Sequence, residues 1–419
     1  GGHDTNYPDF IPPDPRWGST QDFADLVSEI HQRGGLAIPY TNFSWWNLNS
    51  PTLSALPSGT KLKDLVVSDV SGLPDLETYG PKSGVVVDLN NAFVQSRIAQ
   101  QHDTLLNDVG VDGIFEDQFG NRDAPYDYNP SGLGNYDPST TYYAGVVNHF
   151  RDQAGSHLMT ELGIDVLAQF ATGFMGSNYL WDMEGYRTTA AYTSYYPMAG
   201  MLLRDKVLLY QHNLAAQTWT SNIDMLRWNL TQGYGLSNAV FDETLPGLNM
   251  ANPWLNLVGV FQKYALANYA DQLVQSFDDL GNDVTRTKFS TYTVYANWST
   301  DMSYTQDNNT LPPGGVVTRA NDGSVIAGVF TAFNGQPLSD GDHDLVEVRS
   351  ADEIRIFQPV GSDTTIHIPG WSKATVTAYQ YDGTEIADVD TTISGTDVSF
   401  AYQGTLQGQQ VGYYSITPQ

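Results

Sequence analysis

The sequence predicts an α/β barrel of the (β/α)8 type followed by an antiparallel β-sandwich, and three observations support this fold class. Strand-like and helix-like segments alternate from residue 1 to about residue 270. Polar residues gather where the strand-like segments end, which is where parallel barrels carry their functional groups. From about residue 273, short β-runs are separated by Gly, Asn and Asp turns, which is typical of a sandwich. We therefore predict a barrel domain over residues 1–272 and a sandwich over residues 273–419.

The alternation in the first domain can be followed segment by segment. Ser19 and Thr20 are expected to begin a helix that ends near Arg33, because capping residues open an apolar helical pattern and Gly34 and Gly35 close it. The rest of the domain repeats this order, with strands expected at 36–40, 84–89, 111–117, 157–161, 207–212 and 234–240, and helices at 91–108, 140–154, 223–231 and 254–269. The alternative is a doubly wound open sheet, which is less favoured because no Gly-rich phosphate loop follows any strand.

Composition excludes several classes of partner and chemistry. The chain has 47 acidic and 19 basic residues, and a net charge of -28 disfavours binding to nucleic acid and to anionic membranes. No run of about 18 apolar residues predicts membrane insertion. The absence of cysteine excludes disulfides, thiolate nucleophiles and cysteine-based metal sites. The acidic, lysine-poor composition favours an extracellular or cell-surface location.

Two expected strands end in acidic residues, which indicates catalytic chemistry. Residues 111–117 end in Asp117 and residues 157–161 end in Glu161. Buried carboxylates cost several kcal/mol unless they are paired or functional, and neighbouring strands lie about 4.8 Å apart. Hydrolysis of a glycosidic bond needs two such carboxylates, and a separation of about 5 to 5.5 Å makes the reaction retaining. The alternative is that one of the acids is a structural ion-pair partner.

Glu116 and Asp117 are adjacent acids, and either could be the nucleophile. Side chains alternate along a strand, so only one of the two faces the centre of the site. The assignment of Asp117 as the nucleophile is therefore open to a shift of one residue, and Glu116 is otherwise expected to contribute to substrate binding.

The sequence resembles a known group of glycosidases. Four motifs carry the resemblance: Gly1–Phe10, Val86–Leu89, Asp112–Gln118 and Thr160–Gly163. They are similar to motifs in glycosidase-like (β/α)8 barrels of an uncharacterised family related to endo-α-N-acetylgalactosaminidases and, more remotely, to α-galactosidases. The resemblance implies a retaining hydrolase of α-linked polysaccharides or glycoconjugate glycans, with Asp117 as nucleophile and Glu161 as acid/base. It also implies that the first two barrel strands lie before Gly1, in an N-terminal segment that would complete the barrel.

Further residues at strand ends are candidates for substrate binding. The loop residues His3, Asp4 and Tyr7 are expected to bind sugar hydroxyls, unless they fix the loop, and the aromatic residues Tyr40, Trp45 and Trp46 to form a stacking platform. Later strand ends and loops add Gln211, His212, Trp181 with Asp182 and Glu184, and Asp242 with Glu243. His212 is alternatively a structural histidine, and Asp242 is an alternative acid.

Hydrolysis by two carboxylates is expected to require no cofactor. The histidines lack the HExxH spacing of zinc proteases. The acidic run 117–123 permits a structural calcium ion, although it lacks EF-hand spacing. The alternative function is a non-catalytic glycan-binding or structural surface protein built on a former glycosidase barrel.

Overall fold

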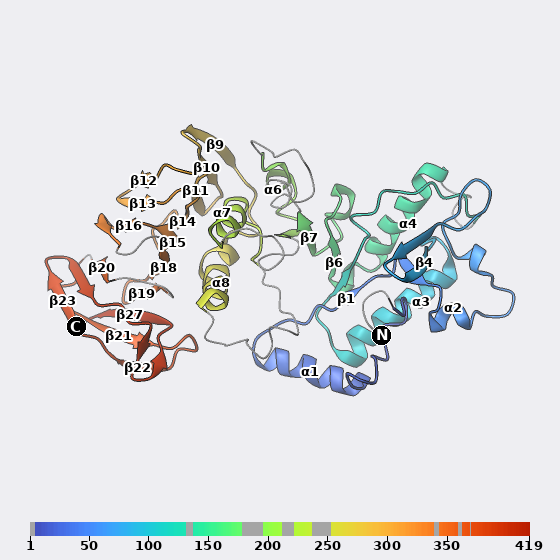
Figure 1. Cartoon of the computed structure of the whole chain (residues 1–419), viewed down its shortest axis with the longest axis horizontal. Helices are drawn as coiled ribbons and strands as arrows, with labels where there is room; N and C mark the ends of the chain where they lie inside the picture. The colour runs from blue at the N-terminus through green and yellow to red at the C-terminus, as the bar shows by residue number, and fades with distance from the viewer. Residues whose placement is uncertain are drawn as a thin grey trace. The chain divides into compact units, whose positions relative to one another are not determined.

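The computed structural model of the chain describes residues 5–130, 137–177, 196–211, 222–236, 253–338, 343–358, 363–368 and 370–419. It divides into two compact units, Gly1–Gly176 and Ser177–Gln419 (Figure 1). The predicted domain boundary between residues 272 and 273 stays a prediction.

The first unit is organised by a parallel sheet, as expected for an α/β fold. The strands lie in the order β1, β5, β6, β7. Their bounds are β1 Tyr40–Thr41, β5 Ile114–Glu116, β6 Leu158–Glu161 and β7 Gly173–Ser177. The register pairs Tyr40 with Phe115, and Phe115 with Met159. The parallel α/β part of the prediction is confirmed, and closure into a barrel stays a prediction.

Three helices of the first unit form where the capping pattern predicts them. Helix α1, Thr20–Gln32, begins with a capping box in which Ser19 and Asp22 bond to each other's backbone amides. Helix α3, Ala92–Asp103, is capped by Asn91, which accepts from Phe93 N at 2.9 Å. Helix α4 spans Pro138–Asp152. The buried apolar residues are Val27 in α1, Val94 and Ile98 in α3, and Tyr142, Val146 and Phe150 in α4.

Residues 84–89, expected among the parallel strands, belong to a different sheet. Strand β4, Lys82–Val86, pairs antiparallel with β2, Trp45–Asn47, and with β3, Leu76–Tyr79. Glycine at position 84 permits the close approach of β4 to β2, since a Cβ there would lie 2.2 Å from the Trp45 ring. The short elements of this unit are α2 Pro51–Ser54, the 3-10 helices Leu62–Asp64, Ala154–Ser156 and Asp165–Leu167, and a π-helical stretch Thr104–Val109.

Asp127 is a buried acid that joins two loops of this unit by hydrogen bonds, and burial of its charge lowers the stability of the folded protein at neutral pH. It is 0% exposed, and its Oδ1 accepts hydrogen bonds from the amides of Ser68 at 3.2 Å and Asn129 at 2.9 Å. Its Oδ2 is buried without a hydrogen-bond partner among the described residues. Burial raises the pKa of Asp127 to about 6, and the charge of Asp88 adds to this rise.

Replacing Asp127 with asparagine is expected to stabilise the protein at neutral pH. A carboxyl whose pKa is raised on folding stabilises fully below its unfolded pKa, and this stability is lost as the pH rises through about 6. Asparagine keeps the Oδ1 acceptor and removes the charge. We expect Asp127→Asn to raise the unfolding free energy by about 2 kcal/mol at about pH 8 and to change little at about pH 4.

Urea unfolding across this pH range measures the effect, and Asp69→Asn is the matched control. Asp69 is exposed and accepts from the amides of Ser71 at 2.8 Å and Leu73 at 2.9 Å, so it makes the same kind of turn without burial. Equal destabilisation of both variants at every pH would contradict the expected cost of the buried charge.

The second unit is built on a ten-stranded sheet, which confirms the antiparallel β-structure predicted for the C-terminal part. The strand order is β22, β21, β27, β19, β18, β15, β14, β11, β10, β9. In sequence these strands are β9 Ser276–Gly281, β10 Val284–Lys288, β11 Tyr292–Asn297, β14 Val316–Ala320, β15 Val325–Phe330, β18 His343–Arg349, β19 Ile354–Phe357, β21 Ala374–Tyr379, β22 Glu385–Asp388 and β27 Tyr413–Pro418.

Both faces of this sheet are covered, because successive side chains of its strands enter different cores. Val316 packs in a core with Leu226 of α7, Asn222–Gln232, and Phe261 of α8, Pro253–Tyr264. Val317 packs on the opposite face with Ile366. That face carries the small sheet β20 Thr364–His367, β24 Asp397–Phe400 and β23 Thr391–Ser394, which gives a sandwich-like layering.

The remaining elements of the second unit are short. They are α6 Met198–Leu202, β8 Leu208–Gln211, the 3-10 helix Leu266–Asn268, the sheet of β12 Tyr304–Gln306, β13 Asn309–Leu311, β16 Ala332–Phe333 and β17 Gln336–Pro337, and the pair β25 Thr405–Leu406 and β26 Gln409–Gln410. Among the described residues, no helix is long and apolar enough to cross a membrane.

Candidate active site

The two predicted catalytic carboxylates follow neighbouring parallel strands at the same level. Glu116 pairs with Thr160 in the register of β5 and β6, so the next residues, Asp117 and Glu161, lie beside each other at the carboxyl ends. Because side chains alternate along a strand, both carboxylates belong to the face that carries Tyr40 and Phe115. The sheet therefore brings together the two residues that the sequence singled out.

Asp117 is held by polar groups from the adjoining strand β1. The Tyr40 hydroxyl donates to Asp117 Oδ2 at 2.7 Å, and the backbone amide of Asp117 donates to the Thr41 carbonyl at 2.9 Å. Burial and the neighbouring Asp117 carboxylate raise the pKa of Tyr40 well above its usual range. Tyr40 therefore keeps its proton, which it donates to Asp117 Oδ2.

Glu161 lies where the loops after β5 and β6 pack against each other. Asn121 Nδ2 donates to Glu161 Oε2 at 3.0 Å. A Cβ at Gly120 would lie 2.4 Å from the Glu161 carbonyl, so only glycine permits this approach. Glu161 is partly exposed. The close loop packing fixes its backbone while its side chain remains open to solvent.

Glu116 points to the opposite face of the sheet, which separates it from Asp117. It is 0% exposed and contacts two histidines, with Oε1 2.8 Å from His102 Nε2 and Oε2 2.8 Å from His149 Nε2. Burial opposes its ionisation, but the charge of His149 and hydrogen bonds from both imidazoles outweigh burial and lower the pKa of Glu116 to about 2. Glu116 is therefore an ionised internal group rather than a substrate-facing one.

Of the three aromatic candidates, Tyr40 contacts Asp117, whereas Trp45 and Trp46 are buried. Tyr40 is 36% exposed and stacks on Phe115 with ring centroids 5.8 Å apart. Trp45 and Trp46 are both 0% exposed, which differs from the predicted stacking platform. The physical reason is that both lie in β2, where they pack as core residues.

Tyr7 reaches the same region from the N-terminal loop. It is 3% exposed, and its ring centroid lies 6.4 Å from that of Tyr40. The loop is fixed by Gln101, whose side-chain oxygen accepts from the amides of Phe10 at 2.8 Å and Ile11 at 3.0 Å. Tyr7 therefore packs against the Tyr40 ring as a buried neighbour.

The other predicted site residues fall outside the described part of the chain. Gln211 ends β8, and its side chain is not described. The remaining predicted residues outside the described ranges are His3, Asp4, Trp181, Asp182, Glu184, His212, Asp242 and Glu243.

A polar network beside Asp117 escaped the sequence analysis. Gln118, at a left-handed φ of 68°, accepts from Arg122 at 2.6 Å and donates to the Tyr79 hydroxyl at 2.6 Å. Arg122 also pairs with Glu77, and Asn42 donates to Gln118 Oε1 at 3.0 Å. These residues come from β3 and loops distant in sequence, so no spacing signal joins them. A calcium ion in the run 117–123 stays a prediction.

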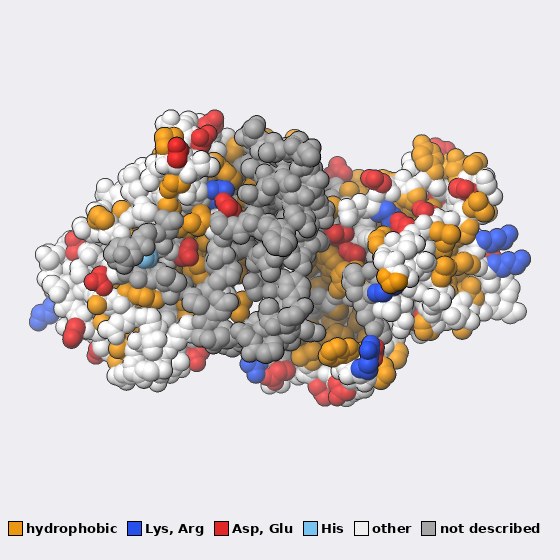
Figure 2. All heavy atoms as spheres, viewed as in Figure 1, with side chains coloured by type: hydrophobic (Ala, Val, Ile, Leu, Met, Phe, Trp, Pro, Cys, Tyr) orange, Lys and Arg blue, Asp and Glu red, His pale blue; other side chains and the backbone are white. Residues whose placement is uncertain are grey.

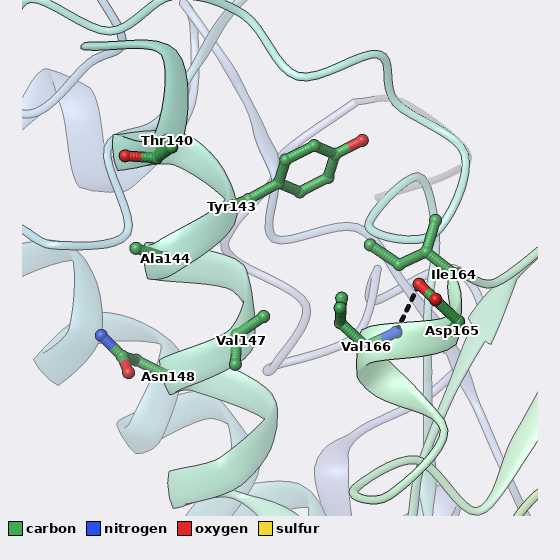
Figure 3. Close-up of a pocket in the computed structure, with 8 residues that line it drawn as sticks. All are labelled: Thr140, Tyr143, Ala144, Val147, Asn148, Ile164, Asp165 and Val166. Atoms are coloured by element: carbon green, nitrogen blue, oxygen red, sulfur yellow. Dashed lines mark hydrogen bonds between the residues drawn. The ribbon is translucent and has the colours of Figure 1, made fainter. Parts of the chain in front are cut away.

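A separate pocket lies outside the candidate site. It has a volume of about 590 Å³ and is lined by α4 and the loop after β6 (Figure 3). Its lining residues are Thr140, Tyr143, Ala144, Val147, Asn148, Ile164, Asp165 and Val166. Neither Asp117 nor Glu161 lines it, so this pocket is distinct from the paired carboxylates.

Comparison with protein families finds one matching family model in the first part of the chain. Residues 1–163 match a family model described as a domain of unknown function (DUF6259). This range contains strands β1, β5 and β6 together with Asp117 and Glu161. A search of curated proteins found no match.

Solved structures similar to the chain are glycoside hydrolases. The α-N-acetylgalactosaminidase NagBb from Bifidobacterium bifidum in complex with GalNAc is 14% identical, with a TM-score of 0.55 over 70% of this chain and 46% of that chain. The fold is glycosidase-like. The ligand-free form of NagBb is 13% identical, with a TM-score of 0.54 and the same coverage of 70% and 46%. The isomalto-dextranase of Arthrobacter globiformis T6 is 13% identical, with a TM-score of 0.46 over 100% of this chain and 85% of that chain. This chain spans about half the length of NagBb, at 46%.

Proposed function

We propose that this chain carries the catalytic site of a retaining glycoside hydrolase that cleaves an α-linked glycan. The supporting observation is the register of β5 and β6, which sets Asp117 and Glu161 side by side on one face of a parallel sheet. Carboxylates about 5 to 5.5 Å apart perform double displacement. The glycosidase-like fold supports the same reaction class.

In this mechanism the two carboxylates act in sequence. Asp117 attacks the anomeric carbon while Glu161 protonates the departing glycosidic oxygen, so the C–O bond breaks as a glycosyl ester forms on Asp117. Glu161, now ionised, takes a proton from a water molecule while the water oxygen attacks the anomeric carbon. The ester bond to Asp117 breaks, so Asp117 leaves as a carboxylate and Glu161 is protonated again. The sugar leaves with its original anomeric configuration.

Tyr40 acts in this mechanism as a positioning residue for the nucleophile. Its hydrogen bond of 2.7 Å to Oδ2 fixes the orientation of the Asp117 carboxylate for attack on the anomeric carbon. Tyr40→Phe is expected to lower kcat by about 10- to 100-fold with little change in KM. Steady-state kinetics on an aryl α-glycoside measures this split, and Tyr79→Phe, which removes a hydroxyl from the Gln118 network instead, serves as control.

The glycan is proposed to be a polysaccharide or glycoconjugate outside the cell. The chain carries a net charge of -28, and Figure 2 shows acidic side chains scattered over the described surface on the face shown. Such a surface repels polyanions and remains soluble in salt. We also propose that the parallel sheet belongs to a (β/α)8 barrel, because this places both carboxylates at the end of the barrel where active sites lie.

Hydrolysis of a panel of α-linked polysaccharides and aryl α-glycosides tests the proposal. The panel includes N-acetylgalactosaminides, galactosides and glucosides, and the chain is compared with Asp117→Asn and Glu161→Gln. Cleavage that both substitutions abolish, with thermal melts unchanged, is the expected result. Absence of cleavage by the unmodified chain, with glycan binding unchanged in both variants, would support the non-catalytic alternative.

A further inference from the structure

Three buried side chains converge behind strand β5, on the face opposite the candidate active site. His102 comes from α3, Glu116 from β5 and His149 from α4. Their side chains are 2%, 0% and 5% exposed. Such a group of ionisable side chains is costly to bury unless its charges are matched within the cluster.

The ligand atoms of this cluster are mutually close. One atom from each residue lies within 4.8 Å of the other two. Glu116 Oε1 lies 2.8 Å from His102 Nε2 and 3.0 Å from His149 Nε2. Both imidazoles thus direct the same nitrogen at a single carboxylate.

The other ring nitrogen of His102, Nδ1, lies next to a hydrogen-bond acceptor. His102 Nδ1 lies 3.3 Å from the side-chain oxygen of Gln153, so a proton on Nδ1 is placed to donate to that acceptor. A proton on Nδ1 leaves the lone pair of Nε2 available to a cation. Such a cation would take the place of the hydrogen that joins His102 Nε2 to Glu116 Oε1 at 2.8 Å.

Aromatic rings pack against both histidines of the cluster. The Phe43 ring centroid lies 5.2 Å from that of His102, and the rings of Phe119 and Phe150 lie 5.4 and 5.7 Å from that of His149. An apolar shell of this kind strengthens the attraction between a cation and its ligands.

We propose that His102, Glu116 and His149 bind a divalent transition-metal ion of the zinc class. Two imidazoles and one carboxylate are a ligand set that Zn²⁺ takes, and the Gln153 oxygen next to His102 Nδ1 is the outer hydrogen bond that orients a metal-bound imidazole. Bonds of about 2.0 to 2.1 Å at tetrahedral angles separate ligand atoms by about 3.3 Å. The observed 2.8 to 3.0 Å reaches this value by side-chain shifts of a few tenths of an ångström.

The ion would join one strand to two helices, and a water molecule would be its fourth ligand. Glu116 directly precedes Asp117, so the metal holds the end of β5 from the side away from substrate. This inference stands on the cluster alone and does not depend on the proposed hydrolase activity.

Metal titration of the full chain tests the inference. The chain is first treated with dipicolinate and then titrated with Co²⁺ and Zn²⁺ alone. We expect one equivalent to bind, a visible d–d absorption band from Co²⁺ in a tetrahedral site, and a higher Tm with Zn²⁺. No binding by the folded, metal-free chain would overturn the inference and leave a protonated imidazole as the balancing charge.

Three variants establish where the ion binds. His102→Gln removes a ligand and is expected to weaken Zn²⁺ binding by at least about 100-fold, whereas Gln153→Ala removes only the outer hydrogen bond and should weaken it about 10-fold. His31→Gln is the control, because His31 is partly exposed and bonds to Asp112 at 2.8 Å. Binding by His102→Gln as tight as that of the unmodified chain would refute the site.

Asp117→Asn separates the two proposals. It is expected to bind Co²⁺ with the unmodified spectrum while losing any hydrolysis, because Asp117 faces the other side of the sheet. A Co²⁺ spectrum lost in Asp117→Asn would place the metal on the wrong face and overturn the inference.

Discussion

Asp117→Gly is expected to lower kcat by about four orders of magnitude or more and to regain cleavage when azide is added. Removing a nucleophile leaves only substrate binding and acid catalysis, so the residual rate is small. The cavity left by the missing carboxylate admits a small anion, which attacks the anomeric carbon directly. The bond to the leaving oxygen breaks as the bond to azide forms, and Glu161 protonates the leaving group.

The configuration of the product identifies the role of each carboxylate. Azide in Asp117→Gly takes the place of the nucleophile, so an α-glycoside yields the β-glycosyl azide. In Glu161→Gln the glycosyl ester on Asp117 still forms from an aryl substrate with a good leaving group. Azide then opens that ester from the original side and yields the α-glycosyl azide. NMR of the isolated azides distinguishes these outcomes.

The matched control is Glu116→Gly, which removes the neighbouring carboxylate on the other face of the sheet. Its product is expected to be the free sugar with or without azide, because Glu116 does not face the anomeric carbon. Formation of the β-azide by Glu116→Gly, but not by Asp117→Gly, would show that the nucleophile assignment is shifted by one residue.

Local patterns were sufficient to predict helices α1, α3 and α4 and the parallel strands β5 and β6, whereas β7, Gly173–Ser177, was not predicted. Ser19 and Asn91 begin α1 and α3 because capping is a contact between residues a few positions apart. Strand β5 ends next to Asp117 as its apolar run predicts. Local patterns also place Asp117 and Glu161 at the ends of two neighbouring strands. Because parallel strands have their carboxyl ends at the same edge of the sheet, the two residues are expected to lie close together.

Contacts between distant residues could not be predicted in this way. Trp45 and Trp46 follow a strand closely and resemble an exposed loop pair, yet pairing of β2 with β4 buries both rings. Glu116 gains its role from His102 and His149, which lie on two different helices. No periodicity links these positions, because their proximity depends on how the helices pack against the sheet.

Glu116→Gln is expected to lower the unfolding free energy of the metal-free chain by about 3 kcal/mol at neutral pH. Removing one partner of a buried ion pair leaves the other partners uncompensated. The lowered pKa of Glu116, about 2, gives the pH dependence. Its stabilisation is complete above its unfolded pKa and is lost as the pH falls towards 2, so the difference between Glu116→Gln and the unmodified chain should shrink below about pH 4.5.

Glu347→Gln in the second unit is expected to change the unfolding free energy in the direction opposite to Glu116→Gln. Glu347 is 4% exposed and pairs with Arg349, but burial outweighs this partner and raises the pKa of Glu347. A raised carboxyl pKa costs stability as the pH rises, so Glu347→Gln is expected to be neutral or stabilising near pH 8. Urea unfolding of both variants with chelator present from about pH 4 to about pH 8 measures the contrast. Equal behaviour of the two glutamates would mean that burial alone, rather than the paired imidazoles, determines the charge of Glu116.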